Sequence, residues 1–453
     1  MKLSIKENST NYVCTVVEIK NLFPIEGADK IQRCNVNGND VVVSKDVKLG
    51  DKMLYFVSGT RLNSEYCTKN NLLDKAELNY DSTKKGFISY KQFRVKAIRL
   101  KGIVSDGVLM PLLSLAPVLG VGVNLETLEV GEEFTDINGV SICEKYFVPC
   151  RNSNPGGKAP NKHNQPKISR LVENQFFLHN DTDNLRKNIH KLNPNDIISI
   201  HYKKHGTSAV YGNVLVKKNL KWYEKLAKKL GVNVVDTGYD LVYSSRKVVK
   251  NEYLNPNQDG GFYGEDIWGV VAKEIKDLVP KNWTLYGEIL GYTPSGAAIQ
   301  SMGGKDFDYG CQRGQHKFYV YKISVVNPDG KVIYLTDKQI EEYCEKVGLL
   351  YKDTFKYYGT INDLFESSEF QDWDVLVREK TSDSWQEILL DYLEYKYNEK
   401  NCYMCTNKVP EEGIILRVEK LEHYEAYKLK SKRFVLGESD AQEKGEENLE
   451  DNQ

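Results

Sequence analysis

Hydrophobic and polar residues alternate with a period of two along many short stretches of this chain, which predicts β-strands. Residues 197–202 and 209–216 show the pattern most clearly, and both are rich in the β-branched and aromatic residues that favour strands. Between them lies the segment Lys203-Lys204-His205-Gly206-Thr207-Ser208, which we predict to be a turn. Further strands are predicted at residues 12–19, 53–57, 283–290, 318–325, 413–418 and 424–430, with a hairpin turn at 36–41.

Three stretches with apolar residues at helical spacing predict α-helices at residues 219–230, 336–347 and 384–397. Gly231 should end the first helix, because glycine is favoured just past a helix C-terminus. The other two helices are predicted to begin with capping boxes, formed by Thr336 with Gln339 and by Ser384 with Glu387. The mixture of strands and helices places the chain in the α+β class.

Changes in composition divide the chain into four regions. Residues 1–140 are dominated by predicted strands and should form one domain. Residues 141–170 contain proline, glycine, asparagine and basic residues with little apolar content, which predicts a flexible linker. Residues 171–435 mix strands and helices in a second domain, and the acidic residues 436–453 should be disordered.

The overall composition is that of a soluble globular protein, with 40% hydrophobic and 28% charged residues among 453. A net charge of −1 argues against indiscriminate binding of nucleic acid, although a local basic face remains possible. The longest apolar run, residues 108–123, is too short to span a bilayer, and the first residues do not form a signal peptide. Nine cysteines, an odd number, predict reduced thiols and a cytoplasmic protein without a membrane partner.

Lys203 is a candidate nucleophile, because it follows a predicted strand and precedes a turn. A lysine amine attacks only after losing its proton, so its site must lower a pKa that starts near ~10.4, by burial or by nearby cations. The Lys-x-x-Gly pattern alone is weak, since Lys228 and Gly231 match it at a helix end. A solvated lysine beside a turn is the alternative for any such pattern.

Four later segments carry residues that could complete a nucleotide site around this lysine. Glu288 lies between two glycines, and Tyr321 lies on a strand rich in aromatic rings. Glu412 begins an apolar strand, while Lys428 and Lys430 share one face of another strand because side chains alternate. In isolation each has a simpler explanation: an exposed carboxylate, a core tyrosine or a solvated strand edge.

Taken in order, these segments resemble the nucleotidyltransferase motifs of ATP-dependent polynucleotide ligases and mRNA capping enzymes. The resemblance implies that Lys203 forms a lysyl-AMP adduct. We expect His205 to have a positional role rather than to act as a general base or a metal ligand. The resemblance assigns nucleotide binding to Glu288 (the sugar), Tyr321 (stacking on adenine, with Phe318 and Tyr319 as alternatives), Arg246, Lys428 and Lys430 (the phosphates), and metal binding to Glu412. The implied cofactors are ATP, as a substrate, and Mg²⁺ or Mn²⁺.

Residues 23–31 and 100–107 resemble the OB-fold module of the fifth RNA ligase family. This likeness implies an N-terminal OB-type β-barrel joined to a nucleotidyltransferase (ATP-grasp-like) domain of antiparallel sheets with flanking helices. It also implies an ATP-dependent RNA ligase that joins 5′-phosphate and 3′-OH ends, at nicks with an RNA 3′-OH, as a monomer without an obligate protein partner. The alternatives are an RNA-capping guanylyltransferase and a non-catalytic OB-fold RNA-binding protein.

A basic stretch at residues 84–101 contains seven lysines and arginines, no acidic residue and three interleaved aromatic rings. Cations for phosphates and rings for bases are typical of nucleic-acid binding, so we predict RNA contacts by Arg94, Lys96, Arg99 and Lys101. A solvated strand edge is the equally weighted alternative. Every nucleotide-handling segment lies in residues 171–435, so this region alone should form the lysine adduct. Cys402 and Cys405 could supply half of a zinc site, but the sequence has no second Cys-x-x-Cys.

Overall fold

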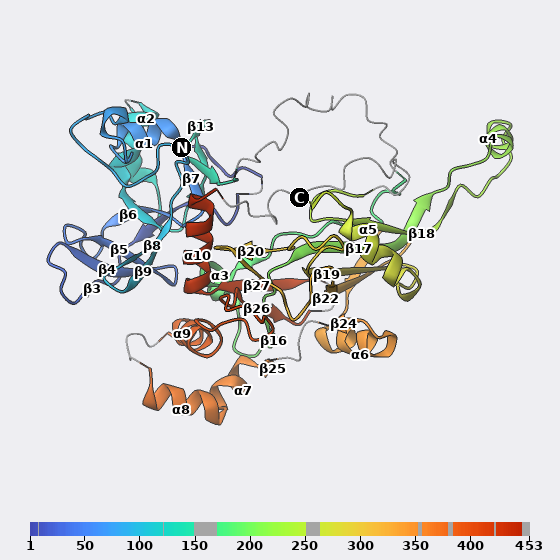
Figure 1. Ribbon diagram of the computed structural model, residues 1–453. Coiled ribbons are helices and arrows are strands. Elements are labelled where there is room, and N and C mark those ends of the chain that lie inside the picture. Colours follow the sequence, from blue (N-terminus) through green and yellow to red (C-terminus); the bar gives the residue numbers. More distant parts are fainter. Residues whose placement is uncertain are drawn as a thin grey trace.

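The computed structural model describes residues 1–7, 9–120, 122–148, 170–250, 263–351, 356–378, 384–420 and 423–445. The N-terminal domain lies at one side of the molecule, and two larger sheets with their helices form the rest (Figure 1). Most of the expected linker, residues 149–169, and the end of the expected disordered tail lie outside the described residues. Within these ranges we find no helix long and apolar enough to cross a bilayer.

The N-terminal domain is built from short antiparallel strands around a four-stranded sheet. In pairing order, this sheet contains β10 (Val108–Pro111), β6 (Lys52–Phe56), β2 (Cys14–Glu18) and β11 (Glu133–Phe134). The strands around it are β1 (Leu3–Ser4), β12 (Asp136–Ile137) and β13 (Val140–Ser141); β3 (Phe23–Pro24), β4 (Ile31–Val36) and β5 (Asn39–Ser44); β7 (Thr60–Leu62) and β14 (Cys143–Lys145); and β8 (Ala97–Leu100) and β9 (Ile103–Asp106). Among the described residues, these pairs do not close into a continuous barrel. The domain also extends past the expected boundary at residue 140, since β14 pairs with β7.

The predicted hairpin turn is present between β4 and β5. Asn37 and Gly38 both have positive φ, 50° and 75°, and they connect the directly paired residues Val36 and Asn39. Two central residues with positive φ match the right-handed twist of paired strands, and asparagine followed by glycine is the sequence that best tolerates them. The Gly38 carbonyl accepts a hydrogen bond of 2.9 Å from Arg186 of the second domain, so this turn also joins the two domains.

Two sheets form the second domain. The five-stranded sheet contains, in pairing order, β15 (Asp183–Asn184), β27 (Glu425–Lys430), β26 (Gly413–Val418), β16 (Ile197–Tyr202) and β25 (Tyr357–Thr360). The six-stranded sheet contains β18 (Thr237–Ser244), β17 (Thr207–Lys217), β19 (Trp283–Gly291), β22 (His316–Val326), β23 (Val332–Tyr334) and, also on β22, β24 (Leu350–Tyr351). All strands predicted in this region are therefore present, and most pairs are antiparallel.

Helices cover each sheet with their apolar faces. The six-stranded sheet packs against α5 (Ile267–Ile275) and α6 (Asp337–Val347), and Cys344 is part of that core, as predicted. The five-stranded sheet packs against α7 (Ile361–Glu366), α8 (Ser368–Leu376) and α9 (Trp385–Tyr397). The capping box predicted for α6 is formed, but α9 has no side-chain cap, because the Ser384 hydroxyl instead contacts Gln386 at 2.8 Å.

Helix α10 (Lys432–Glu443) corrects the expectation that the chain is disordered from residue 436. The helix begins at the N-cap Ser431, whose hydroxyl accepts a hydrogen bond from the Phe434 amide, and it buries Phe434 and Ala441. In Figure 1 it stands between the N-terminal domain and the two sheets. An acidic composition did not prevent folding here because one face of the segment packs against both domains.

Candidate nucleotide-binding site

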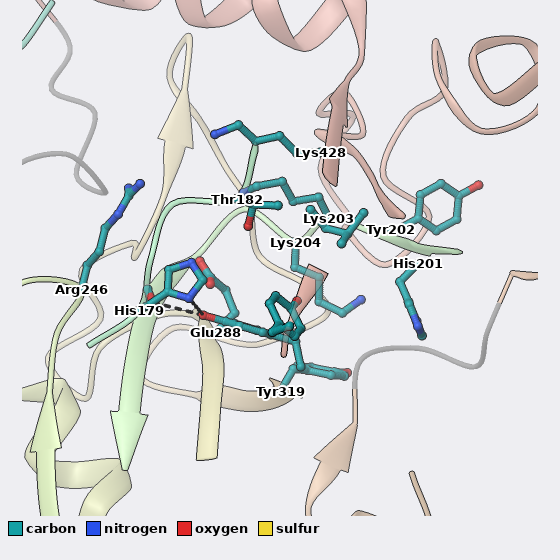
Figure 2. Close-up of a pocket in the computed structure, with 14 residues that line it drawn as sticks. His179, Thr182, His201, Tyr202, Lys203, Lys204, Arg246, Glu288, Tyr319 and Lys428 are labelled. Atoms are coloured by element: carbon teal, nitrogen blue, oxygen red, sulfur yellow. Dashed lines mark hydrogen bonds between the residues drawn. The ribbon is translucent and has the colours of Figure 1, made fainter. Parts of the chain in front are cut away.

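A cavity lies where the two sheets of the second domain meet, and the predicted nucleophile segment crosses it. Lys203 follows the last residue of β16 in the five-stranded sheet, and Thr207 begins β17 in the six-stranded sheet. The Lys203 amide donates a 2.8 Å hydrogen bond to the Gly413 carbonyl. At the other end, the Gly206 amide donates to the Glu288 carboxylate at 3.1 Å. The short segment is thus fixed to both sheets, and Figure 2 shows Lys203 and Glu288 in the same cavity.

Two glycines allow this close approach of backbones. A Cβ atom on Gly206 would lie 2.3 Å from the Ile289 carbonyl oxygen, which no side chain can tolerate. Gly413 has φ of 142°, and a Cβ there would lie 2.1 Å from the Leu429 carbonyl oxygen. Glycine is therefore required at both positions by space, and at Gly413 also by conformation.

Lys203 contacts the carboxylate predicted to bind metal. Its Nζ lies 2.8 Å from Glu412 Oε1, and the two side chains are 17% and 1% exposed. His205 Nδ1 lies 3.7 Å from the other Glu412 oxygen. A carboxylate this close favours the charged ammonium form of Lys203, which cannot act as a nucleophile. A nucleophilic role for Lys203 would therefore require the charge of Glu412 to be neutralised.

The donor set around Glu412 fits a divalent cation that keeps most of its water. Among the described residues, no group of three or more histidine, cysteine or carboxylate side chains is arranged to hold a metal. Mg²⁺ commonly uses one or two carboxylates together with phosphate oxygens and water, so a single buried carboxylate beside a phosphate site is compatible with it. Cys402 and Cys405 form no such cluster within these residues either.

One wall of the cavity carries the residues predicted to hold the nucleoside. Glu288 on β19 is paired with Tyr319 on β22, and both Tyr319 and Tyr321 line the cavity. The Tyr321 hydroxyl contacts His179 Nδ1 at 3.2 Å and Ser208 Oγ at 3.3 Å. Of the three stacking candidates, Phe318 instead belongs to the hydrophobic core behind the wall. Of the three candidates, Tyr319 and Tyr321 therefore remain available to stack on a base in this cavity.

Behind this wall, Lys322 is buried among aromatic rings. Its Nζ lies 3.8 Å from the centre of the Tyr286 ring and 5.0 Å from that of Tyr424, which also lines the cavity. Burial, together with the nearby charge of Arg417, lowers the pKa of Lys322 from its ordinary value to about 7. The aromatic faces stabilise a cation electrostatically but do not replace its lost hydration.

The predicted phosphate-binding residues lie at this cavity or next to it. Lys428 lines the cavity, and its neighbour Lys430 contacts Glu438 of α10 at 3.1 Å. Arg246 also lines the cavity and is paired with Asp181. Burial alone would raise the pKa of the Asp181 carboxyl, but the Arg246 guanidinium outweighs it and the pKa lies below its ordinary value.

A second cavity adjoins the first and is shared between the domains. Lys203, Arg246 and Lys428 line both cavities, which we name the nucleotide cavity and the interdomain cavity. Lys430 lines the second, together with Lys145 from the N-terminal domain and Glu438 from α10. Cations therefore dominate the walls of the interdomain cavity, as a site for a polyphosphate requires.

The basic stretch at residues 84–101 is not a uniform RNA-facing surface. Arg94 is 1% exposed and donates hydrogen bonds to the Ser439 carbonyl and the Gln442 side chain of α10, at 2.7 and 2.5 Å. Its guanidinium holds α10 against the N-terminal domain, and Arg94 also lines the interdomain cavity, so its RNA contact stays a prediction. Lys96 is paired with Glu443 of α10, whereas Arg99 and Lys101 are exposed at a turn. The RNA contacts of these two exposed residues stay a prediction.

Several residues of the site have no signal in the sequence. His179 and Thr182 line the nucleotide cavity from a segment without predicted structure, and the Tyr309 hydroxyl accepts a 2.6 Å hydrogen bond from the His205 amide. The His205 ring packs against Phe307 and Phe434, with ring centres 4.8 and 5.0 Å apart. The contributions of Lys145 and Glu438 depend on how the domains pack, which local pattern does not reveal.

Comparison with known proteins supports both parts of this architecture. A family model described as an OB-fold domain matches residues 13–112. No curated protein matches the sequence. Among solved structures, the RNA ligase of Naegleria gruberi with pyrophosphate is 17% identical, with a TM-score of 0.55, covering 94% of this chain and 98% of that one. A variant of the same ligase with ATP and Mn is 15% identical, with a TM-score of 0.54, covering 96% and 98%. This chain therefore has an N-terminal OB-fold domain and, over nearly its whole length, the fold of the Naegleria gruberi RNA ligase.

Proposed function

We propose that this protein is an ATP-dependent RNA ligase of the fifth RNA ligase family and that Lys203 is its nucleophile. The observation that carries the proposal is the position of the Lys203 amine, 2.8 Å from a buried carboxylate, in a cavity where Glu288, Tyr319 and Tyr321 face Arg246 and Lys428. The fold of a ligase whose structures contain ATP, AMP or pyrophosphate supports the same function.

In the first step the neutral Lys203 amine attacks the α-phosphorus of ATP. A P–N bond forms while the bond from the α-phosphorus to the bridging oxygen breaks, and pyrophosphate leaves with that oxygen. The amine loses a proton, and the product is lysyl-AMP. Glu288 and one of the two tyrosines hold the nucleoside, while Arg246, Lys428 and Lys430 stabilise charge on the phosphates. Lys145 and the rest of the interdomain cavity bind the leaving pyrophosphate.

Glu412 would hold Mg²⁺ or Mn²⁺, with the remaining ligands supplied by water and phosphate oxygens. When bound, such a cation neutralises phosphate charge and the charge of the carboxylate that favours the ammonium form of Lys203. Removing the divalent cation with a chelator should therefore prevent adduct formation.

In the later steps AMP is transferred from Lys203 to a 5′-phosphate, and an RNA 3′-OH then displaces it. The first transfer breaks the P–N bond and forms a 5′-5′ pyrophosphate linkage. The second forms the new phosphodiester and releases AMP. The proposed substrate is a nicked duplex with an RNA 3′-OH, because the site must present both ends in register to one lysine.

Incubation with each labelled nucleoside triphosphate and Mg²⁺ tests this proposal. We expect an acid-labile protein adduct with ATP, and sealing of a nicked duplex in the same reaction. Labelling by GTP alone would identify a capping guanylyltransferase instead. Absence of any adduct, together with RNA binding, would identify a non-catalytic RNA-binding protein and overturn the proposal.

A further inference from the structure

A long hairpin carries a short helix far from the body of the protein. Strands β17 and β18 leave the six-stranded sheet together, and α4 (Trp222–Lys229) lies at their far end (Figure 1). The hairpin extends from the side of the molecule opposite the N-terminal domain. We name residues 217–236 the arm tip. None of the nucleotide-handling residues lies in it, so the proposed adenylylation gives it no role.

The arm tip is strongly basic, although the chain as a whole has a net charge of −1. Its only acidic residues are Glu224 and Asp236, and the latter is paired with Lys228. Its cationic residues are Lys217, Lys218, Lys221, Lys225, Lys228 and Lys229. A local excess of cations on a nearly neutral protein creates a positive potential that attracts a polyanion.

The same segment exposes large apolar side chains. Trp222, Leu230 and Val235 are 77%, 74% and 72% exposed, and no residue of α4 is buried. On the helix, Trp222, Leu226 and Leu230 share one face, and Lys225 and Lys229 border it. This arrangement offers a broad apolar contact with lysines along one edge.

We propose that the arm tip binds the duplex of the nicked RNA substrate at a distance from the nick. The inference rests on the proposed ligase function and extends it to the substrate surface. Lysines beside the apolar face would reach phosphates, while that face and the Trp222 ring contact the wide, shallow minor groove of an A-form duplex. Charge complementarity selects a polyanion, and the hairpin connects the arm tip directly to the segment that contains the nucleophile.

The length of the hairpin predicts how long a duplex must be to reach the arm tip. Strand β17 runs from Thr207, four residues after the nucleophile, to Lys217 at the arm tip. At about 3.3 Å per residue, this strand carries the arm tip roughly 35 Å from the site, which is on the order of 10 base pairs of duplex. A substrate shorter than this on the arm side cannot reach the arm tip.

Two variants test the proposal. In the first, residues 219–235 are replaced by Asn-Gly, because the Lys218 amide already bonds the Asp236 carbonyl at 2.7 Å and a two-residue turn can close the hairpin there. The second is K221A/K225A/K228A/K229A. Its matched control, K273A/K276A/K331A/K346A, removes the same charge from exposed lysines elsewhere on the same domain.

The readouts are equilibrium binding to nicked RNA duplexes with about 6 or about 18 base pairs on either side of the nick, and adduct formation with ATP. We expect both variants to bind the long duplex about tenfold more weakly than wild type, with the salt-dependence slope reduced by about 3 in the lysine variant. The short duplex, the control variant and adduct formation should be unaffected.

Equal binding of the long duplex by wild type and both variants would overturn the proposal. If wild type but not the hairpin variant then sediments with anionic lipid vesicles, the arm tip is a lipid-binding surface instead. A change of oligomeric state on removal of the arm tip would identify contact with a second copy of the chain. Loss of the ATP adduct from wild type would contradict the ligase function, whatever the arm tip binds.

Discussion

The two adjoining cavities differ in how the chain builds them. The nucleotide cavity is lined by residues of the second domain only, most of them on a strand or close to a strand end. The interdomain cavity combines the N-terminal domain, the lysines of β27 and the C-terminal helix α10. The difference teaches that the chemistry of a strand pair can be predicted from short segments, whereas a site between domains depends on packing over long sequence distances.

Arg94 and Lys428 illustrate the contrast. Both are basic residues in segments predicted to bind phosphates. Lys428 lies on β27 two strands from the nucleophile, where strand pairing leaves it facing the cavity. Arg94 is almost fully buried because α10, some 340 residues later, packs over it. A segment therefore reveals the direction of its side chains but not what will cover them.

The largest predicted effect separates the nucleophile from its sequence mimic. Lys203→Ala should abolish the AMP adduct, because it removes the amine that we propose attacks the α-phosphorus. Lys228→Ala should leave the adduct unchanged, since Lys228 belongs to an exposed helix end. Gel detection of labelled protein checks both. Full labelling of Lys203→Ala would mean that the nucleotide cavity has been placed wrongly.

The next largest effects should come from the charged residues that we assign to the metal and the phosphates. Glu412→Ala, Lys428→Ala and Lys430→Ala should each lower the adenylylation rate by a factor of about 10² or more, because each removes charge stabilisation from the displacement. Single-turnover measurements at saturating ATP provide the comparison. Wild-type rates in all three variants would contradict the assignment of these residues to phosphates and metal.

Lys145→Ala tests whether the interdomain cavity takes part in the first step. We expect adduct formation at limiting ATP to fall about tenfold, because a cation near the leaving pyrophosphate is lost. Sealing of a nick that already carries 5′-AMP should be unchanged, since no pyrophosphate is then present. Lys101→Ala, at an exposed turn of the same domain, is the control for adduct formation.

The same measurement also distinguishes between two predictions about which part of the chain is needed for adduct formation. The sequence predicts that residues 171–435 suffice for adduct formation, whereas the interdomain cavity requires the N-terminal domain as well. Normal adduct formation by Lys145→Ala would favour the sequence prediction and remove the interdomain cavity from the first step.

The smallest expected effect concerns Lys322, which is buried behind the nucleotide cavity, and the pH dependence of stability. Burial lowers the pKa of Lys322 to about 7, whereas an unfolded lysine titrates near ~10.4. Between these values the unfolded chain binds more protons, so the free energy of unfolding should rise with pH; below about pH 7 both states are protonated and this dependence disappears. Lys322→Met should remove this rise of the unfolding free energy with pH.

The difference in unfolding free energy between wild type and Lys322→Met should therefore change by about 2 kcal/mol between about pH 7 and about pH 8.5. Urea unfolding at several pH values measures it. The exposed Lys229→Met is the control and should show a constant difference. A constant difference for Lys322→Met as well would mean that the Lys322 amine keeps its ordinary affinity for protons.

Much of the second domain could be predicted from the sequence, for a physical reason. Alternation with a period of two reports which face of a strand is buried, and β16, β26 and β27 have nearly the predicted bounds. Lys203 directly follows β16, Glu412 directly precedes β26, and Glu288 lies on the predicted strand β19, so the positions of all three could be predicted from the strands. The stacking ring could be narrowed only by the structure, which buries Phe318 in the core and leaves Tyr319 and Tyr321 at the cavity.

Other features depended on contacts that no local pattern contains. The acidic residues of α10 do not reveal its buried face, because its partners lie in the N-terminal domain and in distant segments of the second domain. The helix at residues 219–230 was predicted from its amphipathic pattern, but its position at the tip of a projecting hairpin was not, since such a pattern usually marks a helix packed on a core.

The most direct test of the central claim is to map the adduct on the wild-type protein. The protein is incubated with ATP and Mg²⁺ and digested, and the peptide carrying AMP is sequenced by mass spectrometry. We predict modification at Lys203 alone. AMP at Lys204, at Lys228 or at any other residue would contradict the mechanism proposed here.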